Sequence, residues 1–281
     1  SLASIDSSLE NEITDVLDSS DTNTSEAPVI TSKDVVVENT VLVNKDGVLI
    51  TATGIEQGLL GTELKLSIEN NTNINLVFNI RDVSVNGFMI RAPFSEIINA
   101  GEKLNTCLNF EKESLKECNI DIFAYMEFSF EVSKVEVGEV YLDTEIFKLE
   151  TTVSSIYTQK IDDSGDVLYD DSGIKIVKKG LASGDSTFGP GVILYVENNS
   201  TKNYTLQGCT AIVNGYGMST ILSQEITAGN KVITKLMFLK SSLDENNITD
   251  IHSIETQFYI SETDDYMNSI YTDMIKMDFN S

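Results

Sequence analysis

Apolar and polar residues alternate along much of the chain after about residue 34. Large aliphatic residues occupy alternate positions in residues 64–68 and 192–196, and a longer run with apolar residues at alternate positions spans residues 120–132. A period of two places successive side chains on opposite faces of a strand, so these stretches predict β-strands with one buried face. Residues 76–80 alternate in the same way, and the phase shifts by one at 83–85, which predicts a β-bulge. Long helical periodicity is absent here, so the sequence predicts an all-β fold.

Turn signals separate the predicted strands. The stretches "NKDG" (44–47) and "DDSG" (170–173) lie between β-like runs, as hairpin turns do. Only three prolines occur in the chain, which permits long strands. Each half of residues 34–281 then holds about seven or eight strands, which is the pattern of a β-sandwich.

The two halves share the same short phrases. "ENN" occurs at 69–71 and 197–199, and "VNG" occurs at 85–87 and 213–215, each pair 128 positions apart. Solenoid repeats have periods of about 20–50 residues, so this period indicates a duplicated domain. We therefore predict an acidic N-terminal tail at 1–33 and two β-sandwich repeats, at 34–152 and 153–281.

The tail differs in composition from the repeats. Residues 1–32 contain seven acidic residues and no basic one. Such a stretch buries too little apolar surface to order by itself, so a flexible spacer is expected. Its apolar residues recur at near-helical spacing, which favours a short amphipathic helix with Ser4 or Asp6 as the N-cap.

Charge excludes several classes of partner. The chain of 281 residues has 44 acidic and 19 basic side chains, for a net charge of −25. Nucleic acids and anionic membrane surfaces need clustered lysine and arginine, so neither is an expected partner. No apolar run approaches 18 residues, so this segment is not expected to insert into a membrane.

The repeated phrases carry a resemblance. "VLVNKDGVLITATGI", followed by "LKLSIENN" and "VSVNG", and the matching "VLYDDSGIKIVKKGL", "VILYVENN" and "AIVNG" resemble the tandem telokin-like, immunoglobulin-like β-sandwich modules of exported proteins and lipoproteins of Gram-positive gut bacteria. The resemblance covers residues 34–281 and rests on turn and core residues. It implies an extracellular or cell-surface location, secreted or anchored by a lipid on an upstream cysteine. It also implies a non-enzymatic binding or accessory role without a cofactor.

One acidic stretch suggests a metal site. "DDSGDVLYDDSG" (162–173) brings together several carboxylates, which are ligands that Ca²⁺ prefers. The stretch lacks the EF-hand pattern, so the alternative is a solvated linker and hairpin. The candidate calcium ligands are Asp162, Asp163, Asp166, Asp170 and Asp171.

Catalytic motifs receive little support. "DSG" occurs at 163–165 and 171–173, as in aspartic peptidases, but the second copy aligns with "KDG" at 45–47, which a turn explains. "GDSTFG" (184–189) does not satisfy the GxSxG pattern. A Ser-His-Asp triad would depend on His252, the only histidine. We therefore expect no enzymatic activity.

The three cysteines do not form a framework. Cys107 and Cys118 lie in the same half and could form a disulfide, while Cys209 has no partner in its half. Free, partly buried thiols are the preferred interpretation and the alternative to that disulfide. No CxxC pair occurs, and one histidine does not complete a zinc site.

The expected partner is an unknown protein or glycan at the cell surface. A glycan- or solute-binding alternative would use a groove between the repeats or exposed aromatic rings. The candidate rings are Tyr195, Tyr204 and Tyr216. Glycosylation sequons occur at Asn70, Asn198 and elsewhere, and turn-forming asparagine is the preferred interpretation. The loop "GDSTFGPG" is the largest difference between the copies and a place to look for function.

Overall fold

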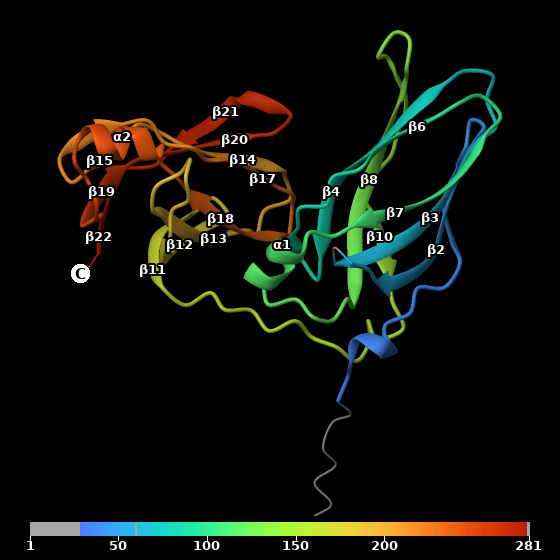
Figure 1. The fold of residues 1–281 in the computed structure, drawn as a ribbon, viewed down its shortest axis with the longest axis horizontal. Coiled ribbons are helices and arrows are strands. Elements are labelled where there is room, and N and C mark those ends of the chain that lie inside the picture. Colours follow the sequence, from blue (N-terminus) through green and yellow to red (C-terminus); the bar gives the residue numbers. More distant parts are fainter. Residues whose placement is uncertain (1–28, 60, 280–281) are drawn as a thin grey trace, which may run out of the picture.

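The computed structural model describes residues 29–59 and 61–279, and its regular structure is almost entirely β (Figure 1). The predicted all-β class, with several antiparallel sheets, is confirmed. We call the elements from β1 to β10 module 1 and those from β11 to β22 module 2. Module 1 follows the short helix η1 (Ser32–Asp34) and contains β1 (Thr40–Lys45), β2 (Val48–Gln57), β3 (Thr62–Asn70), β4 (Leu76–Val85), β5 (Phe88–Met89), β6 (Ser95–Ile98), β7 (Lys103–Asn109), α1 (Lys112–Glu117), β8 (Tyr125–Lys134), β9 (Val140–Asp143) and β10 (Phe147–Glu150).

Module 2 repeats this order of elements, with two of the strands divided. It contains β11 (Asp166–Asp171), β12 (Ile174–Ala182), β13 (Gly191–Asn198), β14 (Tyr204–Gly208), β15 (Ala211–Val213), β16 (Tyr216–Met218), β17 (Ser223–Ile226), β18 (Lys231–Leu236), α2 (Lys240–Glu245), β19 (Ser253–Thr256), β20 (Phe258–Glu262), β21 (Asp265–Tyr271) and β22 (Ile275–Asp278).

One sheet of each module begins with the predicted hairpin. In module 1 the strand order is β1-β2-β3-β7, and in module 2 β11-β12-β13-β18 follow in the same antiparallel order. The turn residues Asp46 and Gly47 have φ of 51° and 80°, and Ser172 and Gly173 have φ of 53° and 81°. Positive φ at both central residues is the geometry of a type I′ hairpin turn. Both predicted hairpins are therefore confirmed, and "DSG" at 171–173 is a turn.

The second sheet of module 1 is built on two long strands, β4 and β8. Around them the order is β10-β8-β4-β5 at one end, and β6 and β9 pair with β4 and β8 at the other. Module 2 breaks both long strands, giving two sheets with the corresponding orders β22-β19-β15-β16 and β17-β14-β20-β21. The register of β4 on β8 shifts between Arg81 and Ser84, which confirms the predicted bulge.

Two details of the sequence prediction are wrong. The count of about seven or eight strands per half is too low, because short edge strands such as β5 and β16 carry no alternation of their own and because β14–β15 and β19–β20 are interrupted. The run at 120–132 is a strand only from Tyr125 onward. Ile120 and residues 122–124 are buried without being in a strand, so apolar content extended the predicted strand too far.

The first asparagine of "ENN" is buried in both modules, and its side chain holds the following turn by hydrogen bonds to backbone groups. We call an asparagine with this role a bracket. Asn70 Nδ2 donates to the carbonyl oxygens of Ile74 (2.8 Å) and Ile98 (2.9 Å), while its Oδ1 accepts from the Thr72 N–H at 3.1 Å. Asn198 makes the corresponding bonds 128 positions later. Its partners are Lys202 O (2.7 Å), Ile226 O (2.9 Å) and Ser200 N (3.0 Å). Both side chains are fully buried, so these two sequons hold turns and are closed to glycosylation.

The asparagine of "VNG" is a second bracket. Asn86 Nδ2 donates to Ile122 O at 2.6 Å, and Oδ1 accepts from Ala124 N at 2.9 Å. In module 2, Asn214 binds Asp250 O at 2.7 Å and His252 N at 2.8 Å. Asn86 and Asn214 have φ of 52° and 49°, a conformation that asparagine tolerates better than most residues. The repeated phrases thus mark the side chains that fix the turns.

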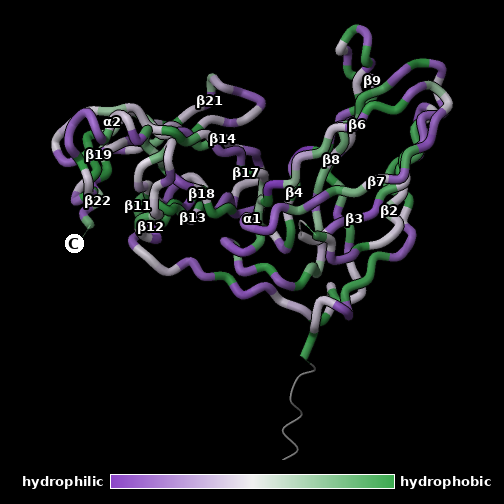
Figure 2. The backbone as a smooth tube through the Cα atoms, in the orientation of Figure 1, coloured by the Kyte–Doolittle hydropathy of each residue, from purple (hydrophilic) through white to green (hydrophobic). Residues whose placement is uncertain are grey.

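Two apolar clusters lie inside the molecule, and the hydropathy colouring shows the apolar strand positions (Figure 2). The first takes its side chains from both sheets of module 1, including Ile50, Leu66, Phe78 and Phe128. The second lies within module 2, although the half-buried Met89 of module 1 packs against it. The first cluster also contains Val177 and Tyr195 of module 2, so the modules share buried apolar surface where they meet.

Among the described strands, one parallel bridge joins the sheets of the two modules. The carbonyl oxygen of Gly87 accepts the Lys231 N–H at 2.9 Å, which pairs β5 with β18. This pairing gives a ten-stranded sheet that runs from β10 through β5 and β18 to β11. In Figure 1 the linker after β10 passes beneath α1 to reach β11, so the two modules lie side by side. The helix predicted within residues 1–17 lies outside the described residues.

The Asn198 bracket makes a prediction about stability. Asn198→Ala removes both donors and leaves the Ile226 and Lys202 carbonyl oxygens without this partner, so the free energy of unfolding should fall by about 2–4 kcal/mol. Urea unfolding followed by far-ultraviolet circular dichroism measures the change. Asn199→Ala, at the neighbouring exposed position, is the control and should stay within about 0.5 kcal/mol of the parent. Equal losses in the two variants would contradict the bracket.

Candidate functional site

A groove between the modules has a volume of about 660 Å³. Asp82 of β4, Met89 of β5 and Glu117 of α1 lie on the module 1 side, and Gln224 of β17 and Lys235 of β18 lie on the module 2 side. The bulge in β4 and the β5–β18 bridge bring these elements together. The groove is therefore a product of the junction.

The groove walls are charged and partly cross-linked. Lys235 Nζ of module 2 lies 2.5 Å from Glu117 Oε1 of module 1 in the groove wall. A second contact between the modules, outside the groove lining, is the hydrogen bond that Asn230 Nδ2 donates to Glu127 Oε2 at 3.3 Å. Burial, followed by repulsion from Asp82, raises the pKa of the Glu225 carboxyl beside this region. The lining of the groove itself carries both signs of charge, with Arg81, Arg91 and Lys235 beside Asp82, Glu111, Glu113 and Glu117.

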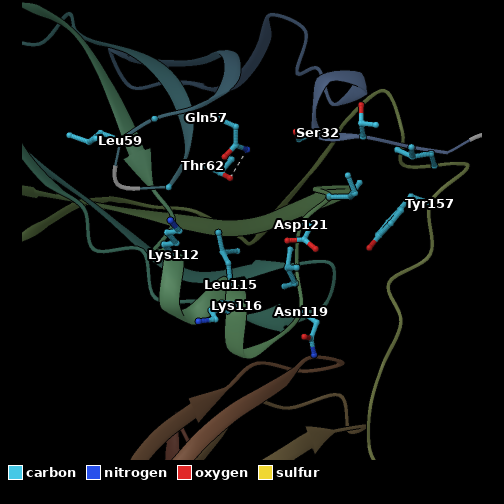
Figure 3. Close-up of a pocket in the computed structure, with 16 residues that line it drawn as sticks. Ser32, Gln57, Leu59, Thr62, Lys112, Leu115, Lys116, Asn119, Asp121 and Tyr157 are labelled. Carbon is cyan, nitrogen blue, oxygen red and sulfur yellow. Dashed lines mark hydrogen bonds between the residues drawn. The ribbon is translucent and has the colours of Figure 1, made fainter. Parts of the chain in front are cut away.

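A second cavity, of about 850 Å³, lies at the base of module 1 (Figure 3). Lys112 and Leu115 of α1 line one side, and Gln57 and Thr62 at the facing ends of β2 and β3 line another. Tyr157 projects into it from the linker, and Figure 3 shows Asp121 on the same side of the pocket. This volume lies within the range of about 300–1,000 Å³ common for small-molecule sites.

Polar atoms of this pocket already have partners within the protein. Gln57 Nε2 donates to Thr62 Oγ1 at 2.9 Å, and the Tyr157 hydroxyl donates to Gln159 Oε1 at 3.2 Å. Burial, followed by the charge of Asp121, raises the pKa of the Tyr157 phenol. The phenol therefore stays protonated near neutral pH, and it could donate its one proton to a sugar hydroxyl or a carboxylate only in place of Gln159 Oε1.

In module 2 the loop between β12 and β13, which carries the sequence "GDSTFGPG", is held against α2 by hydrogen bonds. The Gly189 N–H donates to Phe238 O at 3.0 Å, and the Lys240 N–H at the start of α2 donates to Thr187 O at 3.0 Å. Asp185 Oδ1 closes the loop by accepting from Thr187 N (2.6 Å) and Phe188 N (2.8 Å). These backbone donors lower the pKa of the Asp185 carboxyl. The extra residues of "GDSTFGPG" thus form an internal contact with α2.

Three of the five candidate calcium ligands lie in ion pairs with lysines of β12. Among the described residues, no three carboxylate, thiol or imidazole groups converge in an arrangement that could hold a metal ion. Hydrogen bonds from Ser164 and Lys179 lower the pKa of Asp162 to about 2. Asp170 and Asp171 lie on the β11–β12 hairpin, and calcium binding by the five stays a prediction that would require release of the lysines. The ion pairs are Asp162–Lys179 (3.0 Å), Asp163–Lys175 (2.8 Å) and Asp166–Lys178 (2.7 Å).

The candidate aromatic and catalytic residues are dispersed. Tyr195 is only 1% exposed, so its predicted role as an exposed ring is wrong, because module 1 covers that face of β13. Tyr204 is half-buried in β14, and Tyr216 is 51% exposed in β16. None of the three lines the groove or the pocket described above. His252 is exposed, and its backbone N–H serves the Asn214 bracket.

Comparisons with known proteins leave the function open. No protein-family model matches the chain, and no curated protein matches it. Among solved structures, the YadV chaperone is 12% identical with a TM-score of 0.27, over 83% of this chain and 100% of that one. A protein of unknown function from Porphyromonas gingivalis W83 is 12% identical with a TM-score of 0.21, over 80% and 95%. Red sea bream transglutaminase is 9% identical with a TM-score of 0.21, over 88% and 31%. Such low scores do not establish a shared fold, so function is argued from this chain's own residues.

The sequence prediction missed the residues that make the junction. Lys231, Ile233 and Lys235 alternate along β18 and face module 1, whereas the matching positions of β7 are Lys103, Asn105 and Cys107. This difference between the copies was the available signal. No helix in the described part of the chain is long and apolar enough to span a membrane.

The reactivity of the buried Cys118 thiol measures whether the junction between the modules is closed. All three cysteines are free, as the alternative to a Cys107–Cys118 disulfide predicted. Burial raises the pKa of the Cys118 thiol to about 12, and the backbone of Ile233 across the junction opposes this shift. At pH 8 the thiol should therefore be protonated and should react with Ellman's reagent at least about tenfold more slowly than the half-buried Cys107.

Mass spectrometry of the modified protein would assign each thiol. Ile233→Asp places a charge at the junction and should raise the rate of Cys118 towards its rate in urea. Thr205→Asp, on a module 2 strand that takes no part in the junction, is the matched control. Equal native rates for Cys107 and Cys118 would contradict a closed junction.

Proposed function

We propose that the chain is a non-enzymatic extracytoplasmic protein made of two tandem immunoglobulin-like sandwiches of the telokin-like kind. In this proposal it is the ectodomain of a lipoprotein, or a secreted protein, with a binding or accessory role towards a protein or glycan at the cell surface. The observation that carries the binding role is the Gly87–Lys231 bridge, which holds the modules as one body around a charged groove.

The fixed junction supports binding for an energetic reason. A flexible pair of domains loses conformational entropy when a ligand holds them together, and a preformed groove avoids that cost. Here the bridge is reinforced by the Lys235–Glu117 ion pair and by the burial of Tyr195 against module 1. The groove is thus present before a ligand arrives.

The surface charge supports the expected class of partner. A net charge of −25 attracts cationic partners at long range and repels nucleic acids and anionic membranes. The same charge favours solubility at high local concentration, as a displayed protein needs. The extracellular assignment itself rests on the resemblance of residues 34–281 to exported modules.

A second candidate function is the binding of a glycan or another small solute. The pocket at the base of module 1 favours it, because an aromatic ring, Tyr157, faces a cavity that Lys112 and Asp121 also line. An aromatic face beside hydrogen-bonding groups is an arrangement that suits sugars.

Cell fractionation tests the proposed location. In the cells that produce it, the full-length protein should be found with the envelope or in the medium, and protease added to intact cells should digest it. A cytosolic enzyme followed in the same samples is the control and should stay intact until lysis. Protection of the protein until lysis would reject the extracytoplasmic role.

A glycan array probed with the full chain tests the second candidate. If the pocket binds sugars, Tyr157→Ala should weaken any hit by about tenfold or more, since ring stacking is lost. Tyr266→Ala, at an exposed tyrosine far along the chain in β21, is the matched control. An array without hits, or equal losses in both variants, would reject sugar binding at this pocket.

A further inference from the structure

The turn that module 1 uses at the junction recurs, uncovered, in module 2. Gly87 and Gly215 both follow the bracket asparagine, with φ of 81° and 90°. A methyl group added at Gly87 would lie 3.2 Å from the Tyr125 hydroxyl and 3.7 Å from Lys231, whereas one added at Gly215 would meet nothing within 4 Å. Phe88 is 3% exposed and its counterpart Tyr216 is 51% exposed. The same edge is thus covered in one copy and open in the other.

The hydrogen-bonding edge is equivalent in the two modules. β5 pairs with β4 through Val85–Phe88 and Ser84–Met89, and β16 pairs with β15 through Val213–Tyr216 and Ile212–Gly217. In module 1 the carbonyl oxygen that precedes β5 accepts the Lys231 N–H. Within the described part of the chain, the equivalent Gly215 carbonyl oxygen has no backbone partner. An open strand edge of this kind is a template for another strand.

The two glutamates of module 1 that bind residues of module 2 at the junction have counterparts in module 2. Glu117 binds Lys235, and Glu127 accepts from Asn230, both across the junction. Their counterparts 128 positions later are Glu245 at the end of α2, which is exposed, and Glu255 in β19, which is half-buried. No ion pair forms with either of these two glutamates among the described residues. Lys276 lies opposite Glu255 in register, as Lys148 lies opposite Glu127, so that neighbour does not distinguish the modules.

We propose that the β16 edge of module 2 is a docking site for an edge strand of a partner protein that carries the pattern lysine-x-apolar-x-lysine on one face. The strand would bind as β18 binds β5. Its first backbone N–H would donate to the Gly215 carbonyl oxygen, and its lysines would face Tyr216 and Glu245. This assignment deepens the proposed binding role and rests on it, because it names the surface and the chemistry of the partner.

Charge argues for a basic partner rather than a second copy of this chain. The only strand of this chain in the position of β18 with a free edge is β7, among the described elements. Its matching side chains are Asn105 and Cys107 in place of Ile233 and Lys235. If β7 of a second copy bound the β16 edge, its Glu102 would occupy the position of Asn230 and would face Glu255. Like charges at that point oppose pairing between copies.

A peptide with the β18 sequence tests the docking site on the full chain. The probe is fluorescein-labelled GNKVITKLM, residues 229–237, and fluorescence anisotropy measures its binding. The Glu245→Lys, Glu255→Lys double variant should weaken binding by about tenfold or more, since the peptide lysine that faces Glu245 then meets a like charge and the acidic charge of Glu255 beside the strand is reversed. The peptide with both lysines changed to glutamate should fail on the parent chain and recover binding on this variant.

The matched control is Glu136→Lys, Glu145→Lys, which makes the same charge change at two exposed positions of module 1. It should bind the peptide as the parent does. Hydrogen exchange on the parent chain adds a measurement that needs no variant, since bound peptide should slow exchange in residues 215–218.

Three outcomes would overturn the proposal. The first is no peptide binding at about 1 mM, which corresponds to an affinity too weak to matter. The second is equal binding of the peptide to both charge variants. The third is self-association of the parent chain that the Glu245, Glu255 variant abolishes. The last would assign the edge to a second copy. An extracytoplasmic chain that fails to bind the peptide rejects this docking site alone, and a cytosolic chain that binds it rejects the location alone.

Discussion

The hydrogen bond from the Lys231 N–H to the Gly87 carbonyl oxygen is the contact on which the arrangement of the modules depends. It can form because Asn86 fixes the turn before β5, through bonds to Ile122 O and Ala124 N. With that turn held, the edge of β5 is presented to β18 and the sheet continues from one module into the next. The groove, the buried Cys118 and the ion pair of Glu117 with Lys235 all follow from this alignment.

The junction also explains why the two modules, which share one order of elements, differ on the outer faces of their first sheets. Within each module the bracket asparagines make the same bonds, because any change there leaves buried carbonyl groups without a donor. On the outer face of the first sheet the copies diverge. Val177, Tyr195 and Ile233 of module 2 cover module 1, while the matching Thr51, Ser67 and Asn105 of module 1 are polar. The buried asparagines are thus the same in the two modules, whereas the residues on the outer face differ because only module 2 uses that face to contact the other module.

Much of the fold could be predicted from local sequence, while the site depended on contacts between distant residues. Alternation identified β3 and β13 because one face of each strand is buried in its own module. The same rule placed Tyr195 on the solvent side, since a period of two cannot show that another module covers that face. The acidic stretch at 162–173 suggested a metal site for the same reason. Its lysine partners on β12 come next to it only when the hairpin closes.

Charge then decides which free edges can meet. With 44 acidic side chains, two surfaces of this chain repel each other unless basic residues are placed between them. At the junction β18 supplies Lys231 and Lys235, so an acidic module can accept its neighbour. At the other two edges this balance is missing, because β7 keeps one lysine and gains Glu102, while the turn before β16 keeps its acidic neighbours. Among the described strands, the charges of two edges of this chain therefore match at the β5–β18 junction between the modules. What remains at β16 is an acidic, aromatic edge whose complement is a basic strand from another protein.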